Sequence, residues 1–232
     1  MTTETSTSLR FALLLTIASG FLDAYTFISR GGVFANAQTG NVILMGIDLS
    51  EGHVRAALAH VWPILAFIVG VAIAHSLKSP RAKRVVNHPI RVAVVAQIAV
   101  LVGVGFVPST VPDALVTVPI AFVAALQIGL FRTVGSLSYI AIATTGNLMR
   151  FTESAYAGFV GKDRESRKTT AVYGTIVGSF AAGAVIGAVC TRIIGHEATW
   201  IPASLLCCAL VLFYVDEREV VRRPAHRRRV AR

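Results

Sequence analysis

Polar side chains gather in two short phrases of a chain that is otherwise strongly apolar. The first phrase, ANAQTGNVILMG, covers residues 35–46, and the second, AIATTGNLMR, covers residues 141–150. Amides and hydroxyls at membrane depth are costly unless they are hydrogen-bonded or line a wet cavity. The two phrases therefore predict a solute-binding or pore element. The candidate binding residues in them are Asn36, Gln38, Thr39, Gly40, Asn41, Thr145, Gly146 and Asn147.

Both phrases have the chemistry to start a short helix. Glycine permits a sharp turn or a close backbone approach, and Thr and Asn side chains can cap the first N–H groups of a helix. A helix N-terminus carries free N–H groups and a partial positive charge, which discontinuous membrane helices use to hold polar solutes. The alternative is that this capping only locks a loop against the helix bundle.

A carboxylate in the first apolar stretch is a further candidate. Asp23 lies inside SGFLDAYTF, and a carboxylate at the centre of a membrane helix costs about 3 kcal/mol. It could bind a proton or a cation, and the alternative is a structural tie to Thr39 or to a facing loop. The corresponding place later in the chain carries Gln127 followed by the apolar Ile128. Any charge-coupling site is therefore expected to be one-sided.

The composition is that of a membrane protein. Of the 232 residues, 54% are apolar and only 15% are charged, and the mean hydropathy is +0.67. The net charge of +10 comes from basic residues in loops and a tail beside apolar stretches. We therefore expect membrane lipids as partners and no nucleic acid. No sizeable soluble domain fits between the apolar stretches.

Six apolar stretches are long enough to cross about 30 Å of hydrocarbon as helices. They cover approximately residues 10–28, 57–77, 91–107, 113–131, 171–191 and 199–215. Two further pieces, 41–49 and 147–159, are too short or too polar for a comfortable crossing. We expect these two pieces to be re-entrant.

The positions of Lys and Arg favour six crossings with both termini in the cytoplasm. The basic stretch 78–91, the polar loop 161–170 and the basic C-terminal tail then lie on the cytoplasmic side, and the opposite loops hold almost no Lys or Arg. If the two short pieces also crossed, the stretch 78–91 and the tail would lie on opposite sides. The predicted organisation is a cytoplasmic tail at 1–9, one transmembrane domain at 10–215 in the cell membrane, and a cytoplasmic tail at 216–232.

The two phrases also mark an internal repeat with halves at about 10–107 and 113–215. Aligning the two Thr-Gly-Asn triplets sets the first predicted crossing against the fourth. Later matches in the same order are Phe67 with Phe180, Gly70 with Gly183 and Ala74 with Gly187. Each half has three crossings, and an odd number inverts the second half in the membrane. The predicted fold is an all-α membrane protein with six transmembrane helices in a 3+3 inverted repeat and two re-entrant or broken-helix segments.

The remaining notable residues predict packing. Small residues at four-residue spacing in 57–77 and 171–191 let helices approach closely, either inside the bundle or in a homodimer. His60 and His75 lie about four turns apart on one helix, so they cannot share a metal and are expected at helix interfaces. No catalytic, metal-binding or nucleotide-binding motif is present in the sequence. We expect no enzymatic activity, no cofactor and no metal.

The chain resembles the YoaK-like family of bacterial membrane proteins, which is a domain-of-unknown-function family. The resemblance covers roughly residues 10–215 and rests on Gly20-Phe21-Leu22-Asp23-Ala24, Val33-Phe34, the two Thr-Gly-Asn triplets and the set Phe180, Gly183 and Gly187. It implies a multi-pass protein of the bacterial inner membrane without an assigned substrate. The chain departs from the Gln-Asn pair expected in the fourth crossing, because Ile128 follows Gln127. This departure argues against two equivalent sites.

The function favoured by the sequence is that of a small-solute transporter or channel-like permease. Its midplane site would consist of the two Thr-Gly-Asn turns, Asp23 and Gln127, and its ligand would be a small solute or a proton. The alternative, from another class, is a non-transporting membrane scaffold or lipid-associated protein in which the polar phrases only lock the bundle.

Overall fold

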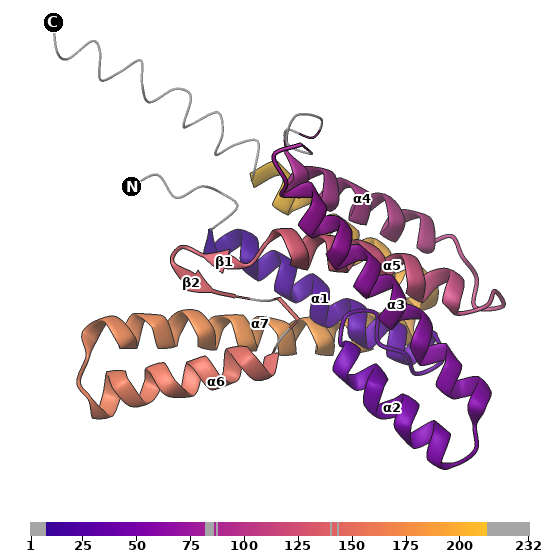
Figure 1. The fold of residues 1–232 in the computed structure, drawn as a ribbon, viewed down its shortest axis with the longest axis horizontal. Coiled ribbons are helices and arrows are strands. Elements are labelled where there is room, and N and C mark those ends of the chain that lie inside the picture. Colours follow the sequence, from indigo (N-terminus) through magenta and orange to yellow (C-terminus); the bar gives the residue numbers. More distant parts are fainter. Residues whose placement is uncertain (1–7, 82–85, 87, 140, 143, 213–232) are drawn as a thin grey trace, which may run out of the picture.

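Helices make up almost the whole of the structure, a computed structural model that describes residues 8–81, 86, 88–139, 141–142 and 144–212 (Figure 1). The elements in chain order are α1 (Leu9–Ser29), α2 (Gln38–Ser50), α3 (Val54–Leu77), α4 (Pro89–Val104), α5 (Ala114–Leu130), β1 (Thr133–Val134), β2 (Leu137–Ser138), α6 (Thr144–Ala155), η3 (Tyr156–Val160), α7 (Arg164–Ile194) and η4 (Gly195–Thr199). Residues 200–212 continue as a helical segment. The predicted tail 216–232 and most of the tail 1–9 lie outside the described residues.

The all-α class is confirmed, apart from the two-residue strands of the β1–β2 hairpin. Within the described residues, three helical stretches are long and apolar enough to cross a membrane, namely Leu9–Ser29, Val54–Leu77 and Arg164–Leu212. The helices α4 and α5 are apolar but shorter. These helices are compatible with insertion into a bilayer.

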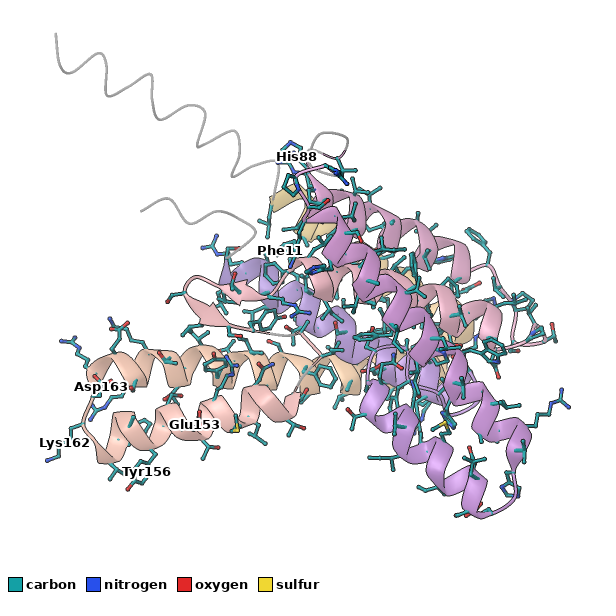
Figure 2. All side chains as sticks on the ribbon, in the orientation of Figure 1. Phe11, His88, Glu153, Tyr156, Lys162 and Asp163 are labelled. Atoms are coloured by element: carbon teal, nitrogen blue, oxygen red, sulfur yellow. The ribbon has the colours of Figure 1, made fainter. Side chains whose placement is uncertain are left out.

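The helix α7 begins earlier than the sequence predicts. The polar run expected as a loop at 161–170 is helical from Arg164 onward. Its cap is Asp163, whose side chain accepts hydrogen bonds from the backbone N–H groups of Glu165 and Ser166. The Ser166 hydroxyl and these two N–H groups hold the pKa of Asp163 below its usual value. Figure 2 shows Lys162 and Asp163 together at the tip of the hairpin that joins α6 to α7.

Two hairpins of helices extend to opposite sides of the molecule (Figure 1). We call the α2–α3 hairpin the first arm and the α6–η3–α7 hairpin the second arm. Each arm starts at one of the polar phrases, because the first triplet lies at the beginning of α2 and the second at the beginning of α6. Each polar phrase therefore lies at the base of one arm.

Helix α7 crosses α1, and helix α3 crosses α5, with the two backbones of each pair in direct contact. A Cβ atom on Gly183 of α7 would lie 2.2 Å from the carbonyl oxygen of Ile17 on α1. A Cβ atom on Gly70 of α3 would lie 2.7 Å from the carbonyl oxygen of Phe122 on α5. The small residues thus pack inside the bundle, which is one of the two arrangements that the sequence predicts for them.

The helix α1 lies at the centre of the core. Its residues Phe11, Leu15 and Phe21 are fully buried, and their cluster includes side chains from α4, α5 and the helical segment 200–212. The helices α3 and α7 instead expose large apolar side chains such as Trp62 and Ile193. Exposed apolar surface on helices of this length fits contact with lipid.

Candidate functional site

Asp23 binds the loop that leads from α1 into α2. Its carboxylate is 5% exposed, and Oδ1 accepts hydrogen bonds from the backbone N–H groups of Asn36, at 2.8 Å, and Ala37, at 3.3 Å. These N–H groups belong to the N-cap residue Ala37 and the residue before it, so the carboxylate lies beside the positive end of the α2 dipole. The tie is to a facing loop and not to Thr39, which was the other partner considered from the sequence.

Two acceptor oxygens beside this contact are buried without a hydrogen-bond partner among the described residues. They are Asp23 Oδ2 and Asn36 Oδ1. The Asn36 side chain is fully buried, and its Nδ2 donates to the carbonyl oxygen of Ser19 at 3.1 Å. Buried acceptors normally meet a donor. A proton on Asp23, a cation, or an N–H or O–H group of a ligand would complete this site.

Asn41 holds the same loop from its other side. Its Oδ1 accepts from the backbone N–H of Phe34 at 2.9 Å, and its Nδ2 donates to the carbonyl oxygen of Phe34 at 2.7 Å and to Gln38 Oε1 at 2.9 Å. The N-cap of α2 is Ala37, which makes no side-chain capping bond. The prediction that Thr39 and Asn41 cap the helix is therefore wrong for α2. The Asn41 side chain bonds the backbone of Phe34, in the loop before α2, and the Gln38 side chain, and it does not bond the free N–H groups of the first turn of α2.

Gly40 and Gly146 occupy matching places in the two triplets but have different surroundings. A Cβ atom on Gly40 would lie 2.7 Å from the ring of Phe34, which stacks on Phe27 with ring centroids 4.8 Å apart. A Cβ atom on Gly146 would meet no described atom within 4 Å. The predicted close approach is therefore present at Gly40.

We expect Gly40→Ala to lower the melting temperature of the detergent-solubilised protein, whereas Gly146→Ala should not. The added Cβ at position 40 must displace the Phe34 ring, at the cost of about 1–3 kcal/mol that overpacking usually carries. At position 146 alanine has room and is the better helix former, by about 0.5–1 kcal/mol. Thermal unfolding followed by intrinsic fluorescence measures both changes. Equal shifts in the two variants would contradict this difference in packing.

The second phrase lies at the start of α6. Asn147 is 4% exposed in the first turn of α6, where Thr145 is exposed and Gly146 is half-buried. Gln127 is 4% exposed on α5. The structure thus brings Asp23, Asn36, Gln38 and Asn41 together around the loop before α2. The four candidates of the second half lie on α5 and α6.

Two ionisable residues next to this site were not identified as candidates from the sequence. His60 on α3 is 4% exposed; its Nε2 lies 3.2 Å from Asp48 Oδ2 on α2, and its Nδ1 lies 3.4 Å from Asn41 Oδ1. The sequence did contain a signal for both His60 and Asp48. Each lies in an apolar stretch, where an ionisable residue is costly and by default indicates a functional site. Within the described part of the chain, no group of three His, Cys, Asp or Glu side chains could hold a metal ion.

Comparison with known proteins gives one match to a family. A family model with the description "Protein of unknown function (DUF1275)" matches residues 11–212. No curated protein and no solved structure matches the chain. The YoaK-like resemblance therefore has no named relative to support it, whereas membership of an uncharacterised family is supported.

Proposed function

The chain belongs to the DUF1275 family, and from that premise we propose that it is a multi-pass membrane transporter or channel-like permease for a small solute. The observation that carries this proposal is the buried contact between Asp23 and the loop before α2, with two acceptor oxygens left unfilled. Asp23 Oδ2 and Asn36 Oδ1 are buried acceptors without a described partner, and they lie beside the non-helical loop between α1 and α2. Such acceptors are suited to bind a polar solute or a proton inside a membrane protein.

The charges at the two ends of the bundle support six crossings with a cytoplasmic N-terminus. Lys78 follows the end of α3, and Arg132 follows the end of α5. Burial, and then the nearby Arg132 charge, lower the pKa of Lys78. The two residues are therefore close together, and α3 and α5 end on the same side of the bundle. Arg30 follows α1 at the other end, where its guanidinium donates to the carbonyl oxygens of Val107, at 2.7 Å, and Pro108, at 3.2 Å. The Lys78 end carries the basic stretch 78–91, as the positive-inside rule requires of the cytoplasmic side.

The helix crossings support an inverted 3+3 repeat. The sequence alignment matches Gly70 with Gly183, and these glycines contact the carbonyl oxygens of Phe122 and Ile17 respectively. The triplet alignment sets Ile17 within one residue of Phe122. The α1–α7 and α3–α5 pairs therefore have the same construction. In each pair, the first crossing of one half packs against the crossing that follows the re-entrant piece of the other half. The two arms extend to opposite sides of the molecule (Figure 1), which fits arms that enter the bilayer from opposite leaflets.

A flux screen in proteoliposomes tests the function. Vesicles with the wild type, with Asp23→Asn or without protein are challenged with small anions, cations and neutral polar solutes, and solute entry is followed by light scattering. A pyranine signal reports proton entry. We expect faster entry of at least one of them with the wild type, and about tenfold or greater loss in Asp23→Asn, because one hydrogen bond to a charged group contributes about 1.5–3 kcal/mol.

Glu153→Gln is the matched control for this experiment. Glu153 is an exposed carboxylate on α6, shown in Figure 2, so its variant makes the same change from carboxylate to amide away from the site. It should keep the wild-type flux. Wild-type flux in Asp23→Asn would reject the site, and no entry above that of empty vesicles for any solute or for protons would reject the transport function.

The second candidate is a non-transporting scaffold or lipid-associated protein. The observation that favours it is that every polar atom of the Asn41 side chain bonds to the protein itself, to Phe34, Gln38 and His60. An amide used in this way holds a loop without needing a ligand. The same flux screen decides between the two, because a scaffold leaves all entry rates at the level of empty vesicles.

A further inference from the structure

The interface between α2 and α3 holds an ionisable pair that is not part of the proposed solute site. His60 Nε2 faces Asp48 Oδ2 at 3.2 Å, and the two side chains are 6% and 21% exposed. His60 is therefore the buried member, and Asp48 is the member that reaches the surface. The pair touches the solute site because His60 Nδ1 lies 3.4 Å from Asn41 Oδ1.

The Asn41 amide determines which imidazole nitrogen holds a fixed proton. Its Oδ1 faces the N–H of Phe34 and its Nδ2 faces the C=O of Phe34, so the amide can have only one orientation. The atom that meets His60 Nδ1 is thus an acceptor. A hydrogen bond there requires the proton on Nδ1, which leaves Nε2 as the nitrogen that gains or loses a proton opposite Asp48.

We propose that His60 and Asp48 form a proton-binding site coupled to Asp23, and that this site supplies the coupling ion of the transporter. The coupling role rests on the proposed function. In the loaded state Nε2–H donates to the Asp48 carboxylate, and the pair has no net charge. On release the Nε2 proton leaves to water through Asp48, so the pair becomes a neutral imidazole facing a carboxylate, with a charge of minus one.

The loop before α2 provides the connection between the two sites. Asn41, which contacts His60, holds this loop at the backbone of Phe34. Asp23 holds it at the N–H groups of Asn36 and Ala37. A change of charge at His60 alters the hydrogen bond at Asn41 Oδ1, and the loop that moves with it carries the partners of Asp23. By linkage, protonation at either site must then affect the other.

The surroundings leave Asp48 as the charge that acts on His60. The helix α5, which packs on α3, has no titratable side chain. Glu51 and His53, at the tip of the first arm, lie 3.2 Å from each other and are more than half exposed. Arg55 is exposed near the start of α3, and α1 contributes Asp23 through the loop. Exposed charges at the tip are screened by solvent, whereas the Asp48 carboxylate faces the ring directly.

The second arm shows that the fold does not require an ionisable pair at this place. The repeat alignment sets Tyr173 opposite His60 and Ser154 opposite Asp48. Tyr173 donates to the carbonyl oxygen of Ser138 at 2.8 Å, and Thr170 bonds Ser154 at 3.1 Å. The Thr170–Ser154 bond joins α7 to α6, and the Arg150 guanidinium of α6 donates to the Tyr173 hydroxyl at 3.4 Å, so no carboxylate among the described residues faces position 173. The charged pair in the first arm has a use beyond holding two helices together.

Nitrogen NMR of the full chain, labelled with 15N-histidine and held in detergent micelles, tests the proposal without any substrate. The His60→Gln spectrum assigns the His60 signals, and the spectra cover about pH 5 to about pH 9, which brackets ordinary histidine titration. We expect Nδ1 to stay protonated throughout and Nε2 to lose its proton as the pH rises. In Asp48→Asn, the Nε2 signal should differ from that of the wild type, because the carboxylate that faces Nε2 at 3.2 Å is gone.

Several results would overturn the proposal. A His60 proton on Nε2 but not Nδ1, an Nε2 state that does not change with pH in the wild type, or the same titration in Asp48→Asn would each reject the pair. An unchanged His60 titration in Asp23→Asn would reject the coupling. The exposed His75 serves as the internal control, because its signals at each pH should be the same in all of these proteins.

Proton entry into pyranine-loaded proteoliposomes separates this proposal from the proposed function. Loss of solute-driven proton entry in His60→Gln, at least tenfold, supports the coupling role. If the NMR result holds but the wild type moves neither solutes nor protons, the proton site stands and the transport function fails. If solute and proton fluxes in His60→Gln equal those of the wild type, the transport function stands and the coupling role fails.

Discussion

Gly183→Val is expected to leave almost no folded protein. The Cβ of any side chain at this position would lie 2.2 Å from the carbonyl oxygen of Ile17 and 2.9 Å from its carbonyl carbon. Both are backbone atoms in the middle of α1, so neither can turn aside as a flexible side chain would. The helices α1 and α7 must separate, and the core around α1 must open with them. We expect a loss of more than about 3 kcal/mol, at or beyond the upper end for overpacking.

Gly178→Val is the matched control on the same helix. Gly178 is exposed, and a Cβ there would meet no described atom within 4 Å. Both variants make the same change in helix propensity, so the difference between them isolates the contact with α1. The yield of monodisperse protein on size exclusion in detergent, followed by thermal unfolding, measures the difference. Similar yields and melting temperatures for the two variants would show that the crossing is not as close as the structure has it.

The helix positions could be predicted from the sequence because a run of about 20 apolar residues is a strong and simple signal. The helices α1 and α3 lie close to the predicted stretches at 10–28 and 57–77. The same signal fails at the start of α7, since hydropathy identifies only the part of a helix suited to lipid. The true start is set by Asp163, a local cap in a polar run.

The composition of the candidate site could be predicted, but its connections could not. Asp23 and Asn41 stand out because polar side chains in apolar stretches are costly. Their partners lie in a loop that folds back on α1, and helical periodicity relates only residues on one helix. The contact of Asp23 with Asn36 depends on that loop, and the contact of Asn41 with His60 depends on how α2 packs against α3. For this reason His60 was expected only as an interface residue.

Asp23→Leu is expected to unfold at a clearly lower temperature than Asp23→Asn. The carboxylate accepts two backbone N–H groups, from Asn36 and Ala37, and leucine accepts neither. Each buried N–H left without a partner costs about 1–3 kcal/mol, part of which is offset because leucine also removes a buried carboxyl group. Asparagine keeps an acceptor oxygen in the same place and should melt close to the wild type. Thermal unfolding in detergent measures both variants.

Flux and melting temperature of the two Asp23 variants, compared with those of one control variant, show whether Asp23 only holds the loop in place or also binds the solute or proton. Thr26→Val removes the hydroxyl that accepts the backbone N–H of Ala35 at 3.1 Å, so it loosens the same loop from α1 without changing a charge. If Asp23 only positions the loop, flux should follow stability, and Thr26→Val should lose more flux than Asp23→Asn. If the carboxylate binds the solute or proton, the order reverses, because Asp23→Asn remains folded but inactive while Thr26→Val is less stable but active. Flux that falls in step with melting temperature across all three variants would contradict a binding role for Asp23.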